Sequence, residues 1–157
     1  MRYYILIIGK FIIILEFCMG IIHIPFYFFF RKYLNKIVLI TGIILYALFV
    51  IFHLITSFIN PGLPTKNYFL ENFNMANSKI QNYVVCKKCK VIMDLDIGTE
   101  HCTDCDICIM GNDHHCQWTS KCIGINNIIF FKLFTFLLFS NIIYLLFTLI
   151  GIFLFSI

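Results

Sequence analysis

The sequence predicts an α-helical multi-pass membrane protein that carries one small cysteine-rich domain. Three observations support this fold class. The chain of 157 residues is 61% hydrophobic and 13% charged, whereas a soluble domain has roughly 45–50% apolar and about 25% charged residues. The apolar residues gather in three long segments, and seven of the eight cysteines fall between Cys86 and Cys122. The net charge of +4 is small and the lysines are scattered, so no basic stripe points to a nucleic-acid partner.

The first apolar segment, residues 3–30, is predicted to be transmembrane helix 1. A span needs roughly 20 mainly apolar residues, and this segment is long enough, although Lys10, Glu16 and His23 interrupt it. The same interruptions, and the lack of a small-residue cleavage site, argue against a secretory signal peptide. We therefore expect the segment to remain in the protein as a span.

Residues 37–59 and residues 128–157 are predicted to be transmembrane helices 2 and 3. The first of these two segments contains no Asp, Glu, Lys or Arg, and the second contains only Lys132, near its start. Both are long enough to cross the apolar part of a bilayer. The chain is therefore expected to have about three transmembrane helices.

Residues 86–127 form the predicted cysteine-rich domain, and residues 60–85 link it to helix 2. The linker begins with Asn60-Pro61-Gly62, a helix stop and turn. Interleaved cysteines and histidines are typical of metal sites rather than of disulfide frameworks. A segment this small lacks a large apolar core, so we expect metal to hold it together. Zinc thiolates persist in reducing compartments, which places the domain in the cytosol.

The domain offers ten candidate zinc ligands, seven cysteines and three histidines. They are Cys86, Cys89, His101, Cys102, Cys105, Cys108, His114, His115, Cys116 and Cys122. Structural zinc takes four ligands in a closed tetrahedral site, and closely spaced Cys-x2-Cys pairs favour zinc. Two zinc ions would use eight of the ten groups, so two groups remain.

Local geometry suggests which two groups remain. If residues 113–116 are extended, alternate side chains share a face, so His114 and Cys116 lie together and His115 points the other way. A metal could then hold His115 while His114 and Cys116 form a base–nucleophile pair. The same alternation places Asp113 with His115, so Asp113 could orient His114 only if the chain bends there.

At these residues the sequence resembles the DHHC-type zinc-finger protein S-acyltransferases, also called protein palmitoyltransferases. The resemblance covers about residues 60–131. Its centre is Asp113-His114-His115-Cys116, which is similar to the family's signature and lies at the family's distance from the surrounding cysteines. Asn127 and the pair Phe130-Phe131 also match, and Asn60-Pro61-Gly62 resembles the family's Asp-Pro-Gly.

The resemblance implies a role for each of the ten groups. Each zinc site would take three cysteines and one histidine: Cys86, Cys89, His101 and Cys108 in one site, and Cys102, Cys105, His115 and Cys122 in the other. Cys116 would be the nucleophile, His114 its base and Asp113 the residue that orients His114. Both zinc ions would be structural, because protein ligands close both sites.

The family's reaction implies substrates and a location. Cys116 would attack the thioester of a long-chain acyl-CoA, such as palmitoyl-CoA, and pass the acyl group to free cysteines of membrane-associated cytosolic proteins. Within the lipid bilayer, the fatty chain would lie among the transmembrane helices, with the thioester at the cytosolic surface. The protein would be a multi-pass protein of the Golgi, endoplasmic reticulum or plasma membrane, with the cysteine-rich domain in the cytosol.

Two departures from the family leave an alternative open. Gln117 stands where the family usually has Pro, and the sequence stops at Ile157, after the third span, where the family has at least a fourth. We interpret this as a fragment in preference to a reduced protein. The alternative function is a catalytically weakened or truncated zinc-binding membrane scaffold of the same family. A RING-type ubiquitin ligase is disfavoured, because it needs no spare His114–Cys116 pair.

Overall fold

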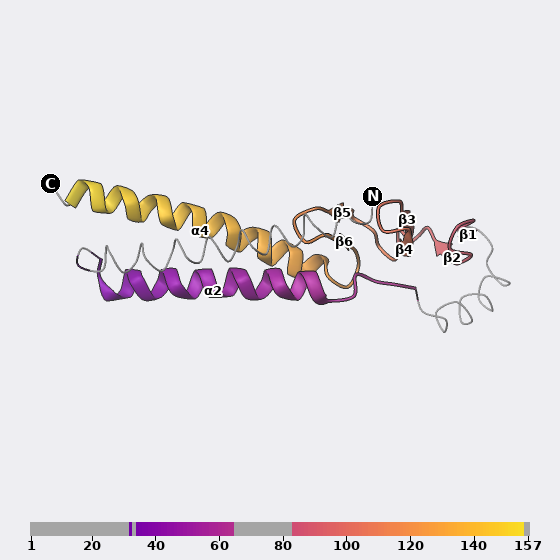
Figure 1. Cartoon of the computed structure of the whole chain (residues 1–157), viewed down its shortest axis with the longest axis horizontal. Coiled ribbons are helices and arrows are strands. Elements are labelled where there is room, and N and C mark those ends of the chain that lie inside the picture. Colours follow the sequence, from indigo (N-terminus) through magenta and orange to yellow (C-terminus); the bar gives the residue numbers. More distant parts are fainter. Residues whose placement is uncertain (1–31, 33, 65–82, 156–157) are drawn as a thin grey trace. The chain divides into compact units, whose positions relative to one another are not determined.

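The computed structural model describes residue 32, residues 34–64 and residues 83–155 of the 157. The elements, in chain order, are α2 (Lys36–Phe58), β1 (Tyr83–Val85), β2 (Ile92–Asp94), β3 (Glu100–Cys102), β4 (Ile107–Ile109), β5 (His114–Cys116), β6 (Lys121–Ile123) and α4 (Ile128–Phe155) (Figure 1). The predicted first span, residues 3–30, lies outside the described residues, as does most of the predicted linker. The chain divides into a hairpin unit, which contains Ser57–Ile129, and a helical unit, which contains α2 up to Thr56 and α4 from Phe130.

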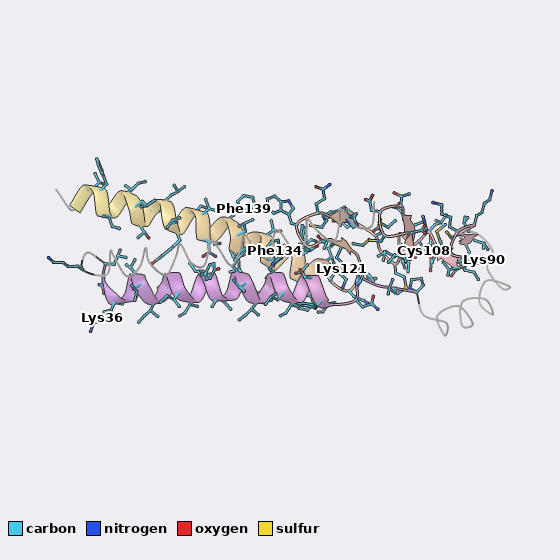
Figure 2. All side chains as sticks on the ribbon, viewed as in Figure 1. Lys36, Lys90, Cys108, Lys121, Phe134 and Phe139 are labelled. Carbon is cyan, nitrogen blue, oxygen red and sulfur yellow. The ribbon has the colours of Figure 1, made fainter. Side chains whose placement is uncertain are left out.

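In the helical unit, α2 and α4 pack against each other in opposite directions. The Tyr144 hydroxyl, late in α4, donates a hydrogen bond to the Val38 carbonyl, early in α2. Phe49, Phe134 and Leu137 form the buried centre of the contact, and the rings of Phe49 and Phe134 stack with centroids 5.4 Å apart. Figure 2 shows Phe134 on the side of α4 that faces α2, with Phe139 on the outer side. Aromatic packing therefore holds the helix pair together.

Both helices are long and apolar enough to cross a membrane. The spans Lys36–Phe58 and Ile128–Leu154 have a mean hydropathy of 2.7 and 2.4. Their outer faces expose large apolar side chains such as Ile37, Phe136 and Phe147, which water disfavours and lipid accepts. The helices begin and end within a few residues of the predicted ranges 37–59 and 128–157. The described residues thus contain two candidate spans, and the predicted first span, residues 3–30, falls outside them.

The hairpin unit consists of three two-stranded antiparallel hairpins, β1–β2, β3–β4 and β5–β6. In the second hairpin His101 lies opposite Cys108, and in the third His115 lies opposite Cys122. Residues directly opposite each other in an antiparallel pair have their side chains on the same face. Each of these two hairpins therefore presents one histidine and one cysteine side by side.

The apolar core of the hairpin unit is small. Ile109 and Ile123 are fully buried, and the core cluster around Ile109 includes the ligand candidates Cys102 and Cys122. Strands of three residues bury too little apolar surface to be stable on their own. This agrees with the expectation that metal ligation supplies much of the stability of the domain.

The Asn60-Pro61-Gly62 turn docks on the hairpins through its backbone. The side-chain Oδ1 of Asn60 accepts hydrogen bonds from the N–H groups of Gly62 and Leu63, both at 2.9 Å. The Gly62 carbonyl then accepts from the N–H of Met110 at 2.8 Å. At the other exit of the unit, buried Asn127 accepts from the Gly124 N–H and donates to the Cys122 carbonyl. Two asparagines thus fix where the chain enters and leaves the hairpin unit.

Replacing Gly124 by alanine should destabilise the hairpin unit. An added Cβ would lie 2.5 Å from the Pro61 carbonyl oxygen and 2.6 Å from Ile109 Cγ2, and overpacking of this kind costs roughly 1–3 kcal/mol. Gly151→Ala is the matched control, because a Cβ there meets no atom of the described chain within 4 Å. Thermal unfolding of the purified full chain in detergent should show a lower Tm for Gly124→Ala only. An unchanged Tm in Gly124→Ala would contradict the packing described.

Candidate functional site

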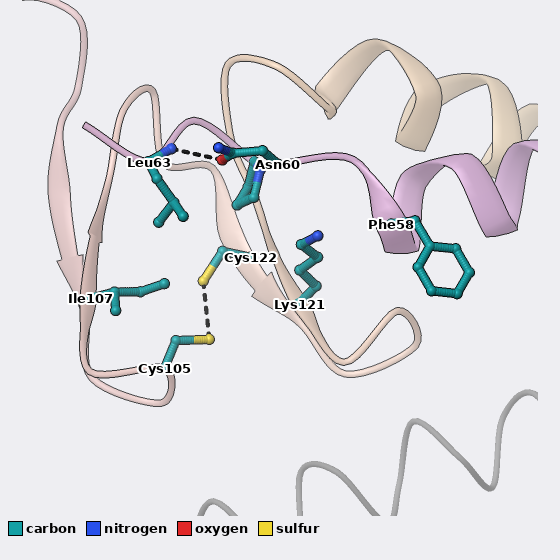
Figure 3. Close-up of a pocket in the computed structure, with 8 residues that line it drawn as sticks. Phe58, Asn60, Leu63, Cys105, Ile107, Lys121 and Cys122 are labelled. Atoms are coloured by element: carbon teal, nitrogen blue, oxygen red, sulfur yellow. Dashed lines mark hydrogen bonds between the residues drawn. The ribbon is translucent and has the colours of Figure 1, made fainter. Parts of the chain in front are cut away.

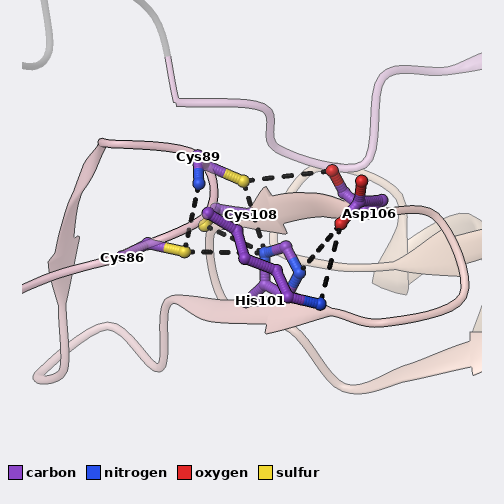
Figure 4. Close-up of polar contacts among 6 residues, drawn as sticks. Cys86, Cys89, His101, Asp106 and Cys108 are labelled. Carbon is purple, nitrogen blue, oxygen red and sulfur yellow. Dashed lines mark hydrogen bonds and ion pairs between the residues drawn. The ribbon is translucent and has the colours of Figure 1, made fainter.

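The first Cys/His cluster joins the first hairpin to the second. Cys86 and Cys89 lie in the turn between β1 and β2, and His101 and Cys108 face each other on β3 and β4 (Figure 4). His101 Nδ1 lies 3.6 Å from Cys86 Sγ, 3.3 Å from Cys89 Sγ and 3.8 Å from Cys108 Sγ. Three sulfurs therefore surround one ring nitrogen.

The second cluster repeats this arrangement one hairpin later. Cys102 and Cys105 lie at the turn between β3 and β4, and His115 and Cys122 face each other on β5 and β6. His115 Nδ1 lies 3.8 Å from Cys102 Sγ, 3.3 Å from Cys105 Sγ and 3.7 Å from Cys122 Sγ. The sulfurs of Cys105 and Cys122 are 3.4 Å apart (Figure 3).

Both clusters have the dimensions of a zinc tetrahedron. In each, the four ligand atoms lie within 4.8 Å of one another. Zn–S bonds of about 2.3 Å and Zn–N bonds of about 2.0–2.1 Å at tetrahedral angles give N···S edges of roughly 3.6 Å and S···S edges of roughly 3.8 Å. The N···S distances of 3.3–3.8 Å surround that value. All seven described cysteines are free. Two Cys3His clusters that fit two zinc ions are therefore present.

The protein alone favours the protonated thiol at several ligand positions. Burial raises the pKa of Cys108 and Cys122, and the neighbouring cluster sulfurs raise it further. Burial also raises the pKa of Cys105. The Cys86 pKa is lowered instead, mainly because the backbone N–H of Cys89 donates to its sulfur at 3.5 Å. A bound Zn²⁺ deprotonates coordinating thiols, so metal and thiolate would form together.

Asp106 lies beside the first cluster, outside its four ligands. Its Oδ1 lies 3.4 Å from His101 Nε2, the ring nitrogen that does not face the sulfurs (Figure 4). The two atoms do not form a hydrogen bond. His101 Nε2 has no hydrogen-bond partner among the described residues. Metal-bound histidines commonly direct this nitrogen at a carboxylate, which orients the ring. Asp106 was not among the predicted site residues, although it lies only two positions before the predicted ligand Cys108.

Lys121 links the second cluster to the C-terminal end of α2. Its ammonium donates to the Ser57 carbonyl at 3.1 Å, and a cation at a helix C-terminus is favourable. Burial lowers the Lys121 pKa, and the nearby Cys105 and Cys122 oppose that shift. A cavity of about 260 Å³ lies here, lined by Phe58, Asn60, Pro61, Leu63, Cys105, Ile107, Lys121 and Cys122 (Figure 3).

Asp113, His114 and Cys116 belong to neither cluster. His114 and Cys116 are alternate residues of β5, so their side chains share a face, and His115 between them faces the second cluster. Asp113 precedes the strand, and its Oδ2 lies 2.9 Å from His114 Nδ1. Cys116 is buried, with 3% of its surface exposed. Asp113 therefore reaches His114, a contact that strict alternation along an extended strand argued against.

Comparison with known proteins identifies the same region. Residues 79–157 match the family described as DHHC palmitoyltransferase. The chain is 30% identical over 128 residues to palmitoyltransferase ZDHHC9 of Danio rerio, covering 66% of this chain and 33% of that protein. It is 43% identical over 49 residues to palmitoyltransferase ZDHHC2 of Rattus norvegicus, covering 31% and 13%.

A fungal relative gives the same result. Palmitoyltransferase ERF2 of Kluyveromyces lactis is 30% identical over 90 residues, which cover 46% of this chain and 24% of that protein. The chain thus spans at most about a third of the length of the relatives it matches. The family match includes half of the chain, both Cys/His clusters and the Asp113–Cys116 segment. The chain belongs to the DHHC palmitoyltransferase family.

Proposed function

We propose that this protein is a protein S-palmitoyltransferase that transfers a long-chain acyl group from acyl-CoA to protein cysteines through an acyl-Cys116 intermediate. The supporting observation is that Cys116 remains outside two complete Cys3His clusters and shares a strand face with His114. The contact of 2.9 Å between His114 Nδ1 and Asp113 Oδ2 supports a base held in one tautomer. The orienting group Asp113, the base His114 and the nucleophile Cys116 then lie within four consecutive residues.

The first step forms the acyl-enzyme. His114 donates its Nδ1 hydrogen to Asp113, which leaves Nε2 to accept the proton of the Cys116 thiol. The Cys116 thiolate attacks the carbonyl carbon of the acyl-CoA thioester and forms a new C–S bond. The bond from that carbon to the CoA sulfur breaks, and CoA leaves with the proton that His114 had taken.

The second step transfers the acyl group to the substrate. A cysteine of the substrate protein gives its proton to His114, and its sulfur attacks the carbonyl carbon of acyl-Cys116. The bond to Cys116 breaks and Cys116 recovers a proton from His114. This two-step exchange conserves one thioester throughout and follows ping-pong kinetics.

We propose that both Cys3His clusters hold structural zinc. With bound zinc, the clusters would cross-link three hairpins that have little apolar core of their own. All four ligands in each cluster come from the protein, which leaves no position open for a substrate. His115 is thereby fixed, and with it the strand that carries His114 and Cys116.

The membrane arrangement belongs to the same proposal. We expect three spans, at residues 3–30, 37–59 and 128–157, the linker over 60–85 and the zinc domain over 86–127. The reducing conditions that zinc thiolates require favour a cytosolic domain, in a Golgi, endoplasmic reticulum or plasma membrane. The substrates would be membrane-associated cytosolic proteins, and α4 begins only 12 residues after Cys116 (128 minus 116), which favours a thioester near the bilayer surface.

Incubation with a palmitoyl-CoA analogue should label the protein with a hydroxylamine-sensitive adduct. Cys116→Ala should abolish the label, because the acceptor sulfur is removed, and His114→Ala should slow labelling by roughly 10²–10⁴-fold. Cys18→Ala is the matched control and should label normally, since Cys18 is the one cysteine outside the cluster region. An unlabelled wild-type protein with full zinc would favour the scaffold alternative. Label that persists in Cys116→Ala would assign the acceptor elsewhere.

Zinc content separates ligands from the nucleophile. Metal analysis of the purified protein should give about two zinc ions per chain, one for each cluster. Cys116→Ala should keep both ions, whereas Cys105→Ala should lose at least one, because the second cluster then has three ligands. Equal zinc loss in the two variants would mean that Cys116 is a ligand.

Asp106→Asn should weaken the first zinc site selectively. Loss of the carboxylate beside His101 Nε2 removes the group that orients the ring, and such changes commonly cost 10–100-fold in metal affinity. Competition with a chromogenic chelator should show one zinc ion leaving more readily. Asp104→Asn, an exposed carboxylate in the same turn, should behave like the wild-type protein. Identical chelation curves for Asp106→Asn and Asp104→Asn would remove Asp106 from the site.

A further inference from the structure

The turns of the three hairpins share one backbone design. Each turn opens with a cysteine, namely Cys86, Cys102 or Cys116. Each opening cysteine pairs across the turn with the residue five positions later, namely Val91, Ile107 or Lys121. The residue four positions after each cysteine has a positive φ: 55° at Lys90, 57° at Asp106 and 50° at Ser120. Few residues other than glycine adopt this conformation, so its recurrence at one position indicates three equivalent turns.

In the first two turns, the opening residue and the residue three positions later face each other. Cys86 and Cys89 are members of one cluster, and Cys102 and Cys105 are members of the other, with ligand atoms within 4.8 Å in each. The turn therefore brings the side chains of its first and fourth positions together.

The third turn has Cys116 at its first position and Thr119 at its fourth. Both residues are buried, with 3% and 8% of their surfaces exposed. The Thr119 hydroxyl oxygen is buried and has no hydrogen-bond partner among the described residues. A buried hydroxyl without a partner is costly. By equivalence with the first two turns, the Cys116 side chain lies on the same side of the turn as Thr119.

Among the residues that the structure describes, the third turn is not part of a four-ligand cluster. The first two turns are each closed by a histidine and a cysteine that face each other on the next hairpin. After β6 the chain continues into α4 (Ile128–Phe155), whose sequence contains neither histidine nor cysteine. The third turn therefore offers only Cys116 and Thr119 where a structural zinc ion would need four ligands. The two side chains can therefore interact with each other instead.

We propose that the Thr119 hydroxyl donates a hydrogen bond to the Cys116 sulfur, which makes Thr119 a further catalytic residue; its part in acyl transfer rests on the proposed function. The thiolate accepts the O–H hydrogen while Thr119 keeps its proton, and the proton of Cys116 goes to Nε2 of His114. A hydrogen bond to the thiolate stabilises the nucleophile before it attacks. The same bond satisfies the buried hydroxyl.

A dithiol reagent tests the placement. In Thr119→Cys the two thiols should lie close enough to react together with phenylarsine oxide, whose arsenic binds both sulfurs and releases one water. Mass spectrometry should find one arsenical on the peptide with positions 116 and 119. The wild-type protein and the double variant Cys116→Ala/Thr119→Cys should carry none there. The absence of the adduct in Thr119→Cys would overturn the placement.

Alkylation tests the role. Thr119→Val removes the hydroxyl at nearly constant shape, and it should slow the reaction of Cys116 with iodoacetamide by about 10- to 100-fold at pH 7. Thr119→Ser keeps the hydroxyl and should react within a few-fold of the wild-type rate. Both variants should retain two zinc ions, which excludes a merely structural effect. A Thr119→Val protein that reacts at the wild-type rate would overturn the inference.

The two tests need no acyl-CoA, so they remain separate from the proposed function. If acyl-CoA does not label the wild-type protein but Thr119→Val is still alkylated more slowly than Thr119→Ser, acyl transfer is refuted and the hydrogen bond stands. If acyl-CoA labels the wild-type protein but Thr119→Val and Thr119→Ser are alkylated at equal rates, acyl transfer stands and the hydrogen bond is refuted.

Discussion

The structure depends on one constraint, the closure of two four-ligand clusters by three short hairpins. No hairpin contains a complete set of ligands. Each cluster takes two cysteines from the turn of one hairpin and a histidine–cysteine pair from the strands of the next. The His101–Cys108 and His115–Cys122 registers are therefore fixed more firmly than strands of three residues could fix them through backbone hydrogen bonds alone. The position of the strand that carries His114 and Cys116 follows from that closure.

The sequence predicted the parts of the fold that depend on long patterns. The apolar runs at 37–59 and 128–157 correspond to α2 and α4, because a long apolar run has few alternatives to a helix. The hairpins were not predicted. Three-residue strands such as His114–Cys116 are too short to show an alternating pattern, and their pairing is set by ligands distant in sequence. The predicted first span, residues 3–30, lies outside the described residues.

The ligand sets illustrate a different limit. Counting showed that two of ten groups are left over, but spacing alone could not divide the other eight between two sites. The resemblance divided them, and the structure brings the same two sets of four together. For Asp113, alternation along a strand argued against contact with His114. The contact forms because Asp113 precedes β5, where its N–H donates to the Ile123 carbonyl and the alternation has not begun. Thr119 was missed, although His-Cys-x2-Cys-x2-Cys at 101–108 recurs as His-Cys-x2-Thr-x2-Cys at 115–122.

The order of the ligands along the chain has a consequence for how the domain assembles. Cys102 and Cys105, which belong to the second cluster, lie between His101 and Cys108, which belong to the first. Binding of one metal ion would order the β3–β4 hairpin and, with it, two of the four ligands of the other site. The second ion would then bind without paying again the conformational entropy of ordering that hairpin. With zinc bound as proposed, we expect the two sites to load with positive cooperativity, with little of the singly loaded form present.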